Sequence, residues 1–392
     1  MRYDFVVVGG GPGGSMTAKT LAEKGAKVLL VEKRPEIGVA VRCAEATGIE
    51  GLKALGVKIK EKFIASRTRG AYLYSPDGTL VDMTGEEYTG YVLERRLFDK
   101  YLAIYAAEAG AEVRTRTYAY DLLIKDNSVK GVFLKQFGKK FLVKCKAVVG
   151  ADGIESKIGR MAGLNTRTKL SQMTSNAQFE MVGIDVHEDI MEFYFGREVA
   201  PRGYAWVFPK GKDIANVGLG IRNANKPALE YLKNFINSKE HLRKGKVTGV
   251  VVGGVPVQGP VEKTYSNGVV LVGDAARHVD PLTGGGIYNA MRCGIIAGEV
   301  LIEALERDDF SEESLAEYER RWKQAIGDAL MRSLRVKEGL EKLNDEQLNQ
   351  IAKLLSELKF GSVDLKSVDL KDVTKIFEEL PPDVIEFLQG LL

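Results

Sequence analysis

Residues 3–32 read YDFVVVGGGPGGSMTAKTLAEKGAKVLLVE, and this stretch decides the fold of the start of the chain. The apolar run at 3–8 predicts a buried strand, and residues 15–24 predict a helix. Residues 28–31 predict a second strand, which ends at Glu32. Glycines fill the turn between the first strand and the helix in the pattern G-x-G-x-x-G. This order of elements predicts a Rossmann-type βαβ unit in a chain of the α/β class.

The glycine turn predicts a binding site for a dinucleotide. Gly9, Gly11 and Gly14 let the backbone approach a pyrophosphate, and the free N–H groups at the start of the helix would face it. Glu32, eighteen residues after Gly14, is placed to accept hydrogen bonds from a ribose diol and to repel a 2′-phosphate. FAD and NAD both fit this pattern, so the turn alone does not choose between them.

Two later segments place a carboxylate beside glycine at the end of a buried strand. The first is GADG at 150–153, and the second contains Asp274. After the second, residues 281–286 form a glycine-rich run that opens a long helix at Ile287. The N-terminus of that helix is suited to negative charge on a reduced flavin ring. The three segments together favour a flavin-binding domain that begins the chain and is resumed late.

Between the second and third segments the pattern changes to short strands separated by turns, which is typical of an antiparallel sheet. The strands expected there are 176–184, 191–195, 204–208, 214–221 and 249–257. Outside this region the pattern predicts a helix at 97–108, a strand at 111–114 and a hairpin of strands at 129–136 and 139–149.

The chain of 392 residues is long enough for two domains. The expected division is a discontinuous Rossmann-type FAD-binding domain at 1–60, 89–167 and 262–310, an inserted antiparallel-sheet substrate domain at 61–88 and 168–261, and a C-terminal helical region at 311–392. The end of that helical region contains two short amphipathic segments separated by Pro381 and Pro382. Their apolar faces are expected to pack on the protein or, alternatively, to dock on a membrane.

The composition is that of an ordinary globular protein and argues against several classes of function. The net charge is +3, and no basic block indicates nucleic-acid binding. Three cysteines in a long chain cannot build a disulfide framework, which favours a cytoplasmic setting. The three histidines are scattered, so no metal is expected. No run approaches the roughly 20 apolar residues of a membrane span, so any membrane contact would be peripheral, at the inner face of the cell membrane.

The three cofactor segments resemble the FAD motifs of the aromatic-ring hydroxylase class of flavoproteins. Within this class the chain is similar to the geranylgeranyl reductase family, especially to its archaeal members that act on digeranylgeranylglycerophospholipids. The segments that carry this closer similarity are PEIG at 35–38, CAE at 43–45, LERRLFD at 93–99, YAWVFPK at 204–210, NVGLG at 216–220 and PLTGGG at 281–286. The similarity spans roughly residues 1–330.

The resemblance implies FAD as the cofactor. The residues expected to bind it are Gly9, Gly11, Pro12, Gly13, Gly14, Glu32, Lys33, Cys43, Ala44, Arg95, Asp152, Gly153, Asp274, Gly284, Gly285, Gly286 and Ile287. The expected catalytic residues are Cys43, Tyr204 and Trp206, and those expected to line the substrate pocket are Tyr204, Trp206, Phe208, Tyr72 and Tyr74. The residues expected at the pocket mouth, where lipid head groups would be bound, are Arg67, Arg69 or Lys210. The alternative for Cys43 is a small buried packing residue without a chemical role. The alternative for Trp206 and Phe208 is ordinary core packing.

The reaction that the resemblance implies is FAD-dependent saturation of isoprenoid double bonds in the geranylgeranyl chains of membrane ether-lipid precursors. An isolated alkene has no electron sink, so a proton must be added as hydride arrives, and aromatic rings can face the positive charge that develops. Cys43 or a bound water is a candidate proton source. Since only one dinucleotide motif is found, the electrons are expected from an external donor, either NAD(P)H or ferredoxin.

Four other functions fit the same class of fold. They are an FAD-dependent monooxygenase of an aromatic or apolar substrate, a flavin-dependent halogenase, a carotenoid cyclase and a non-enzymatic electron carrier. The halogenase is disfavoured because Tyr204 and Phe208 stand where its motif has tryptophan and isoleucine. Product analysis without oxygen separates these functions, because only the reductase yields a saturated product.

Overall fold

The computed structural model describes residues 2–357, so the amphipathic segments predicted beside Pro381 and Pro382 lie outside the described residues. The chain forms two compact units, each assembled from three separate stretches. The first unit contains Met1–Val41, Arg95–Lys169 and Pro256–Met331, and the second contains Arg42–Glu94, Leu170–Val255 and the residues from Arg332 onward.

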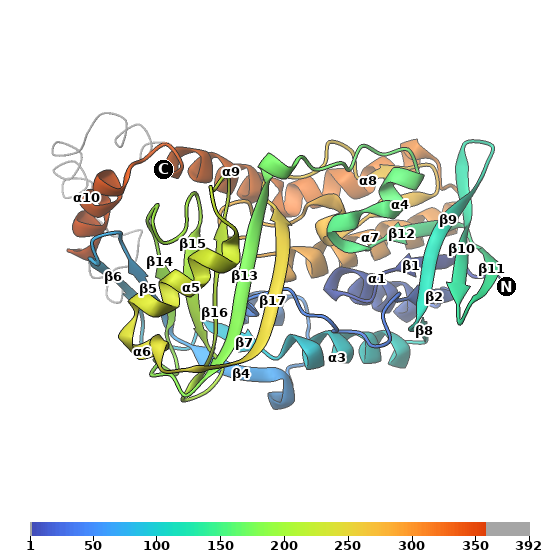
Figure 1. The fold of residues 1–392 in the computed structure, drawn as a ribbon. Coiled ribbons are helices and arrows are strands. Elements are labelled where there is room, and N and C mark those ends of the chain that lie inside the picture. Colours follow the sequence, from blue (N-terminus) through green and yellow to red (C-terminus); the bar gives the residue numbers. More distant parts are fainter. Residues whose placement is uncertain (1, 358–392) are drawn as a thin grey trace. The chain divides into compact units, whose positions relative to one another are not determined.

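A six-stranded sheet forms the centre of the first unit (Figure 1). Its strands, in spatial order, are β18 (Tyr265–Ser266), β19 (Val269–Leu271), β12 (Ala147–Gly150), β1 (Phe5–Val8), β2 (Val28–Val31) and β8 (Glu112–Arg114). Every neighbouring pair is parallel except β18 with β19. The residues of β1, β2, β12 and β19 are all buried, as expected for parallel strands covered on both faces. This confirms the predicted Rossmann-type unit.

Alternation along β1 sends its side chains into two different cores. Phe5 and Val7 pack with residues of the helices α1 (Pro12–Glu23) and α7 (Ile287–Arg307), and α8 (Glu312–Trp322) joins the same core. Val6 and Val8 pack instead against a three-stranded antiparallel sheet. Its strands are β9 (Thr117–Lys125), β10 (Ser128–Gln136) and β11 (Lys139–Lys144). Helices therefore cover one face of the central sheet, and a second sheet covers the other.

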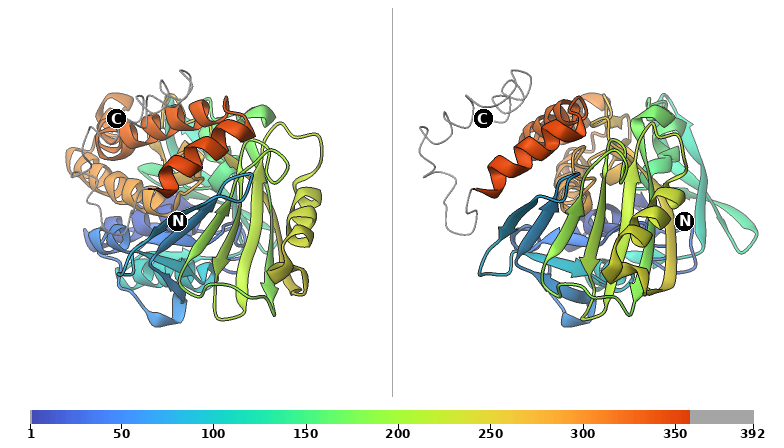
Figure 2. Two further views of the ribbon diagram at one scale, coloured as in Figure 1. Left: turned by 90° about the vertical axis from the view of Figure 1, so that its left-hand side faces the viewer. Right: turned by 60° about the vertical axis from the view of Figure 1, so that its left-hand side comes forward.

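A seven-stranded sheet forms the second unit. Its strands, in spatial order, are β17 (Lys246–Pro256), β13 (Met173–Val182), β16 (Ile214–Ile221), β15 (Tyr204–Pro209), β14 (Met191–Tyr194), β5 (Gly70–Tyr74) and β6 (Leu80–Thr84). Helix α5 (Ala228–Ser238) lies along one face of this sheet (Figure 2) and packs into a core with β13, β14, β15 and β16. A smaller sheet of β3 (Ala46–Gly48), β7 (Gly90–Leu93) and β4 (Ile64–Thr68) belongs to the same unit.

The remaining described elements are short or helical. In the first unit they are α3 (Arg95–Glu108), α4 (Lys157–Met161) and 3-10 turns at Gly153–Glu155 and Gly273–Ala276. In the second unit they are α2 (Ile49–Ala54), α6 (Glu240–Arg243), α10 (Asp345–Ser356) and 3-10 turns at Glu61–Phe63 and Leu170–Gln172. A π-helical turn at Lys323–Gly327 leads from α8 into α9 (Asp328–Leu340). The described part of the predicted C-terminal region is thus helical.

Two predictions about strands were wrong. The strand expected at 139–149 is two strands, because the chain leaves β11 at Lys144 and enters the central sheet as β12 at Ala147. The sheet of the second unit is mixed rather than antiparallel, because β14 pairs in parallel with β5. Both errors have one physical cause: pairing between strands far apart in sequence leaves no local signal.

Candidate active site

The glycine turn before α1 is shaped by close backbone contacts. Gly9 has a φ of +112°, and a Cβ atom on it would lie 2.1 Å from the carbonyl oxygen of Ala151. A Cβ on Gly14 would lie 2.0 Å from the carbonyl oxygen of Gly9. Side chains at these positions would therefore push apart the turn, the helix and the loop after β12.

Gly11 differs from these two glycines because open space lies beside it. Apart from Gly11 itself and its two neighbours along the chain, no described residue comes within 4 Å of the position that a Cβ on Gly11 would take. Gly11 is also the N-cap of α1, it makes no side-chain cap, and Pro12 follows at the first helical position. Free N–H groups at a helix start, beside space kept clear by a missing side chain, fit the pyrophosphate of a dinucleotide.

Glu32 is fixed at the end of β2 by two backbone groups. Its Oε2 accepts a hydrogen bond from the N–H of Gly10 at 3.0 Å, and its Oε1 accepts one from the N–H of Arg34 at 2.9 Å. The carboxylate is thereby held beside the glycine turn, where a ribose would be recognised. The neighbouring Lys33 forms an ion pair with Glu155 at 3.2 Å, with both side chains partly in solvent.

The two later acids carry carboxylates that are withdrawn from water. Asp152 Oδ2 accepts a hydrogen bond from the N–H of Ile158 at 3.0 Å, whereas its buried Oδ1 has no hydrogen-bond partner among the described residues. Desolvation raises the pKa of Asp152 and of Asp274. For Asp274 the Arg95 guanidinium acts in the opposite direction, and Arg95 itself makes a bidentate pair with Asp99 at 2.8 Å. An unpaired buried acceptor of this kind fits a ligand that donates hydrogen bonds.

The glycine run before α7 is fixed by an acid that was not among the predicted site residues. Asp280 Oδ1 accepts hydrogen bonds from the N–H groups of Leu282 and Thr283 at 3.0 and 2.8 Å. The N–H of Gly284, which has a φ of +71°, donates to the carbonyl oxygen of Asp280 at 2.9 Å. The loop ends at Gly286, the N-cap of α7, which has no side-chain cap. An aspartate that precedes such a turn is the signal that could have identified Asp280.

In the second unit, one face of β15 carries an aromatic cluster. Tyr204, Trp206 and Phe208 alternate with two small residues that face the opposite core. The ring of Phe193, on β14, lies 5.5 Å from that of Tyr204 and 5.2 Å from that of Phe208. Trp206 and Phe208 are buried and Tyr204 is half-buried. The structure therefore brings together three of the five residues predicted to line the substrate pocket.

The other two, Tyr72 and Tyr74, point to the opposite face of the same sheet. Tyr74 pairs in register with Tyr194, and their rings stack 4.5 Å apart at 10°. Tyr194 belongs to the core under α5, whereas its neighbour Phe193 belongs to the aromatic cluster of β15. Since side chains alternate along a strand, both tyrosines of β5 face the α5 side. The prediction that they join the sheet was confirmed, but the structure does not bring them to the aromatic cluster.

Cys43 lies in a turn just before β3. It is half-buried, and its Sγ accepts a hydrogen bond from the N–H of Glu45 at 3.2 Å. The other two cysteines are buried in the first unit, where desolvation raises the pKa of Cys145 to about 12 and also raises that of Cys293. Of the three thiols, Cys43 is therefore the one with access to solvent.

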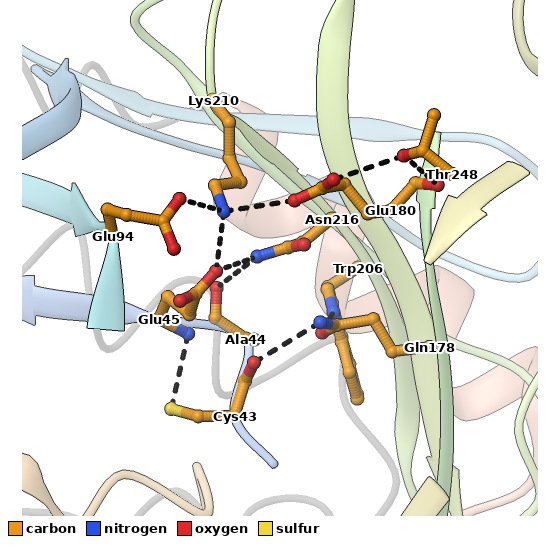
Figure 3. Close-up of polar contacts among 10 residues, drawn as sticks. All are labelled: Cys43, Ala44, Glu45, Glu94, Gln178, Glu180, Trp206, Lys210, Asn216 and Thr248. Carbon is orange, nitrogen blue, oxygen red and sulfur yellow. Dashed lines mark hydrogen bonds and ion pairs between the residues drawn. The ribbon is translucent and has the colours of Figure 1, made fainter. Parts of the chain in front are cut away.

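Lys210, which was expected at a pocket mouth, is surrounded by three carboxylates. Its side chain is only 6% exposed, and its Nζ lies 3.0, 2.9 and 3.1 Å from the carboxylates of Glu45, Glu94 and Glu180 (Figure 3). Burial lowers the pKa of Lys210, but the carboxylates outweigh it, Glu45 most of all, and the net pKa is raised. Its ammonium group is already paired with three carboxylates, so it is not free to bind a lipid head group.

The two arginines predicted to bind head groups are also paired within the second unit. Arg67 contacts Glu61 at 2.6 Å, and Arg69 contacts Asp189 at 2.9 Å. Each arginine is partly exposed, so these ion pairs are open to competition from an anionic ligand.

Two negative findings apply to residues 2–357. No helix there is long and apolar enough to cross a membrane. No group of three or more histidine, cysteine or acidic side chains in the same residues could hold a metal ion.

The fold and the cofactor loops define the class of protein, an oxidoreductase with a Rossmann-like dinucleotide-binding domain. The family model of the NAD(P)-binding Rossmann-like domain matches residues 7–58. That of the geranylgeranyl reductase catalytic domain matches residues 172–255, which include the aromatic cluster of β15.

Full-length relatives then give the family. The chain is 46% identical to the digeranylgeranylglycerophospholipid reductase of Methanocaldococcus jannaschii, over 100% of this chain and 98% of that protein. It is 49% identical to the enzyme of the same name from Methanosarcina acetivorans, over 93% of this chain and 91% of that protein. The chain therefore belongs to the geranylgeranyl reductase family, among the digeranylgeranylglycerophospholipid reductases.

Solved structures agree with this assignment. The crystal structure of a geranylgeranyl bacteriochlorophyll reductase-like protein from Thermoplasma acidophilum matches with a TM-score of 0.92 and 37% identity, covering 100% of this chain and 99% of that one. A flavin-dependent brominase matches with a TM-score of 0.71 and 18% identity, covering 100% of this chain and 98% of that one. At that identity the second likeness is one of fold alone.

Proposed function

We propose that this protein uses FAD to saturate double bonds in the geranylgeranyl chains of membrane ether-lipid precursors. The observation that carries the proposal is the full-length similarity to digeranylgeranylglycerophospholipid reductases. The second unit supports it, because the aromatic cluster of β15 supplies the apolar wall that a prenyl chain needs. We further propose that the enzyme works at the inner face of the cell membrane and takes electrons from NAD(P)H or ferredoxin.

The residues proposed to hold FAD lie in the loops described above. The pyrophosphate would meet the glycine turn, the adenosine ribose would meet Glu32, and the isoalloxazine would meet the loop before α7. The full proposed set is Gly9, Gly11, Pro12, Gly13, Gly14, Glu32, Lys33, Cys43, Ala44, Arg95, Asp152, Gly153, Asp274, Gly284, Gly285, Gly286 and Ile287. When bound, FAD supplies the hydride for reduction of a carbon–carbon double bond.

The residues of the chain itself must supply the rest of the chemistry. A trisubstituted alkene that gains a proton develops positive charge on its more substituted carbon. The rings of Tyr204 and Trp206 can stabilise that charge through their faces while they exclude water. Cys43 is proposed to hold the proton at Sγ, because its thiol is the accessible one and lies in the same unit as the aromatic cluster.

The test is an anaerobic reduction assay. Enzyme reduced with dithionite is given geranylgeranyl diphosphate or a geranylgeranylated glycerol lipid, and the products are analysed by mass. We expect increments of two daltons on the prenyl chain, with FAD released by heat from the purified protein. The proposal would be wrong if no two-dalton increment appeared with or without oxygen and if the aerobic reaction incorporated oxygen or halide into the product. The protein would then be a monooxygenase or a halogenase.

A further inference from the structure

The turn formed by residues 43–45, here called the 43–45 turn, is held by the large sheet of the second unit (Figure 3) and by β7. Each of its three carbonyl oxygens accepts a hydrogen bond from a different element. The donors are the Gln178 amide of β13 at 3.2 Å, the Asn216 amide of β16 at 3.3 Å and the Leu93 N–H of β7 at 2.9 Å. A turn with every carbonyl engaged has few alternative conformations.

The backbone of this turn needs such support. Glu45 has a φ of +78°, in the left-handed region that is unfavourable for a non-glycine residue. Its carboxylate is buried, and Oε2 accepts hydrogen bonds from Asn216 Nδ2 at 2.7 Å and from Lys210 Nζ at 3.0 Å. The unfavourable backbone angle therefore persists because the side chain of the same residue is fixed from the sheet.

Lys210 is the centre of this arrangement. It is the cation among three carboxylates, those of Glu45, Glu94 and Glu180, and it lies directly after the aromatic strand β15. Removal of its charge would leave the Glu45 carboxylate buried without its ion-pair partner, which strongly destabilises a local structure. The 43–45 turn is thus tied to Lys210 through the carboxylate of Glu45.

Gln178 connects the same turn to the aromatic cluster. Its Nε2 donates to the carbonyl oxygen of Cys43, and its Oε1 accepts from the indole Nε1 of Trp206 at 3.0 Å. One amide side chain therefore touches two of the three residues proposed to act on the alkene. A shift of the turn would change the distance between the thiol and the indole ring.

From these contacts we propose that Lys210 and Gln178 are positioning residues that hold Cys43 in a fixed place against the aromatic cluster. They touch neither substrate nor cofactor in this proposal. They act through the 43–45 turn, so their loss should slow the chemical step more than it weakens substrate binding. The catalytic part of the inference rests on the proposed reductase function, whereas the structural part does not.

The structural part is tested by alkylation of Cys43 in the full-length protein. The rate with a maleimide is measured from pH 6 to pH 10, so that the plateau reports access to the thiol and the midpoint reports its ionisation. In Lys210→Met we expect the plateau rate to rise about tenfold, which equals about 1.4 kcal/mol of easier opening. The matched control is Lys212→Met, which removes an exposed lysine two residues further along.

Two further variants separate positioning from general damage. Lys210→Arg keeps the charge and should label like the wild type. Lys210→Met combined with Glu45→Gln should recover most of the protection, because the two carboxylates that then lack the ammonium group, those of Glu94 and Glu180, are partly exposed. Gln178→Glu keeps the acceptor for Trp206 but places a carboxylate oxygen against the carbonyl of Cys43, so it should also expose the thiol. If Lys210→Met does not fold, the labelling rate of Cys43 is compared in Gln178→Glu and in the double variant of Lys210→Met with Glu45→Gln.

The catalytic part is tested with the prenyl-reduction assay. We expect kcat of Lys210→Met and Gln178→Glu to fall about tenfold with KM changed less than about twofold, the pattern of a lost transition-state interaction. Unchanged labelling plateaus in both variants would overturn the proposal, as would faster labelling with unchanged kcat. A wild-type protein that reduces no prenyl chain would instead refute the proposed function and leave the labelling result to decide the structural part.

Discussion

At the scale of single residues, Glu32 offers the most direct test of the cofactor site. Its carboxylate is already oriented by the N–H groups of Gly10 and Arg34. Glu32→Ala should weaken FAD binding by about 1.5–3 kcal/mol for each ribose hydrogen bond lost, or roughly 10- to 100-fold in Kd. The measurement is titration of the apoprotein with FAD by fluorescence. Glu36→Gln, which removes a partly exposed partner of Arg96 and Lys100, is the control and should leave Kd unchanged.

Cys43 gives a second prediction at this scale. If Sγ delivers the proton, Cys43→Ala should lower turnover by roughly 100-fold or more, the usual size of a general-acid contribution, while the flavin spectrum stays that of the wild type. Cys43→Ser should keep part of the activity because its hydroxyl can carry a proton. Full activity in the alanine variant would return Cys43 to the role of a small packing residue.

A site residue could be predicted from the sequence only where it belongs to a pattern of neighbouring residues. Glu32 and the glycines belong to one continuous pattern of about 30 residues, and the pattern has a backbone reason for each position. Gln178 and Asn216 have no such pattern. Their partners in the 43–45 turn lie 135 and 172 positions away along the chain, so only the folded sheet brings them together.

At the scale of elements, the two faces of the large sheet should behave differently when aromatic residues are removed. Trp206 belongs to the proposed substrate face, so Trp206→Leu should raise KM and lower kcat for prenyl reduction. Tyr74 stacks on Tyr194 on the opposite face. Tyr74→Leu should therefore lower the melting temperature, through a loss of about 0.5–1.5 kcal/mol beyond area burial, with KM unchanged.

This comparison also tests the sequence-based prediction that Tyr72 and Tyr74 line the pocket. A KM for the Tyr74 variant that rises as much as that of the Trp206 variant would support the prediction, against the alternation seen in β5. The period of two along each strand could be predicted from the sequence. The face that each strand presents could not, because it depends on the parallel pairing of β5 with β14.

At the scale of the whole molecule, the path of the chain limits how the two units can be studied. Each unit is built from three stretches, and the chain passes between them after Val41, Glu94, Lys169, Val255 and Met331. A truncation at Glu94, Lys169 or Val255 would remove strands or helices from both units, whichever end of the chain is cut away. Experiments on either unit therefore need the full chain.

The stability of the whole molecule should depend on pH through His278. This residue is fully buried, its ring lies 4.7 Å from that of Trp322, and neither ring nitrogen has a hydrogen-bond partner among the described residues. Burial lowers its pKa from 6.5 to about 3. The unfolded chain therefore binds a proton that the folded protein does not, between pH 6.5 and pH 3. Stability should be lost as the pH falls through this window, at about 1.4 kcal/mol per pH unit from this residue alone.

Because carboxylates also titrate in acid, the useful quantity is the difference between the wild type and His278→Leu. The leucine side chain cannot take up a proton, so between pH 6.5 and pH 5.5 the wild type should lose about 1 kcal/mol more unfolding free energy than the variant. Urea unfolding followed by tryptophan fluorescence measures this, since Trp322 packs directly on the ring in question. His187→Leu, which removes a histidine from an exposed position, is the matched control. Equal pH slopes for the wild type and His278→Leu would mean that the buried imidazole is protonated in the folded protein, contrary to its surroundings of apolar and aromatic groups.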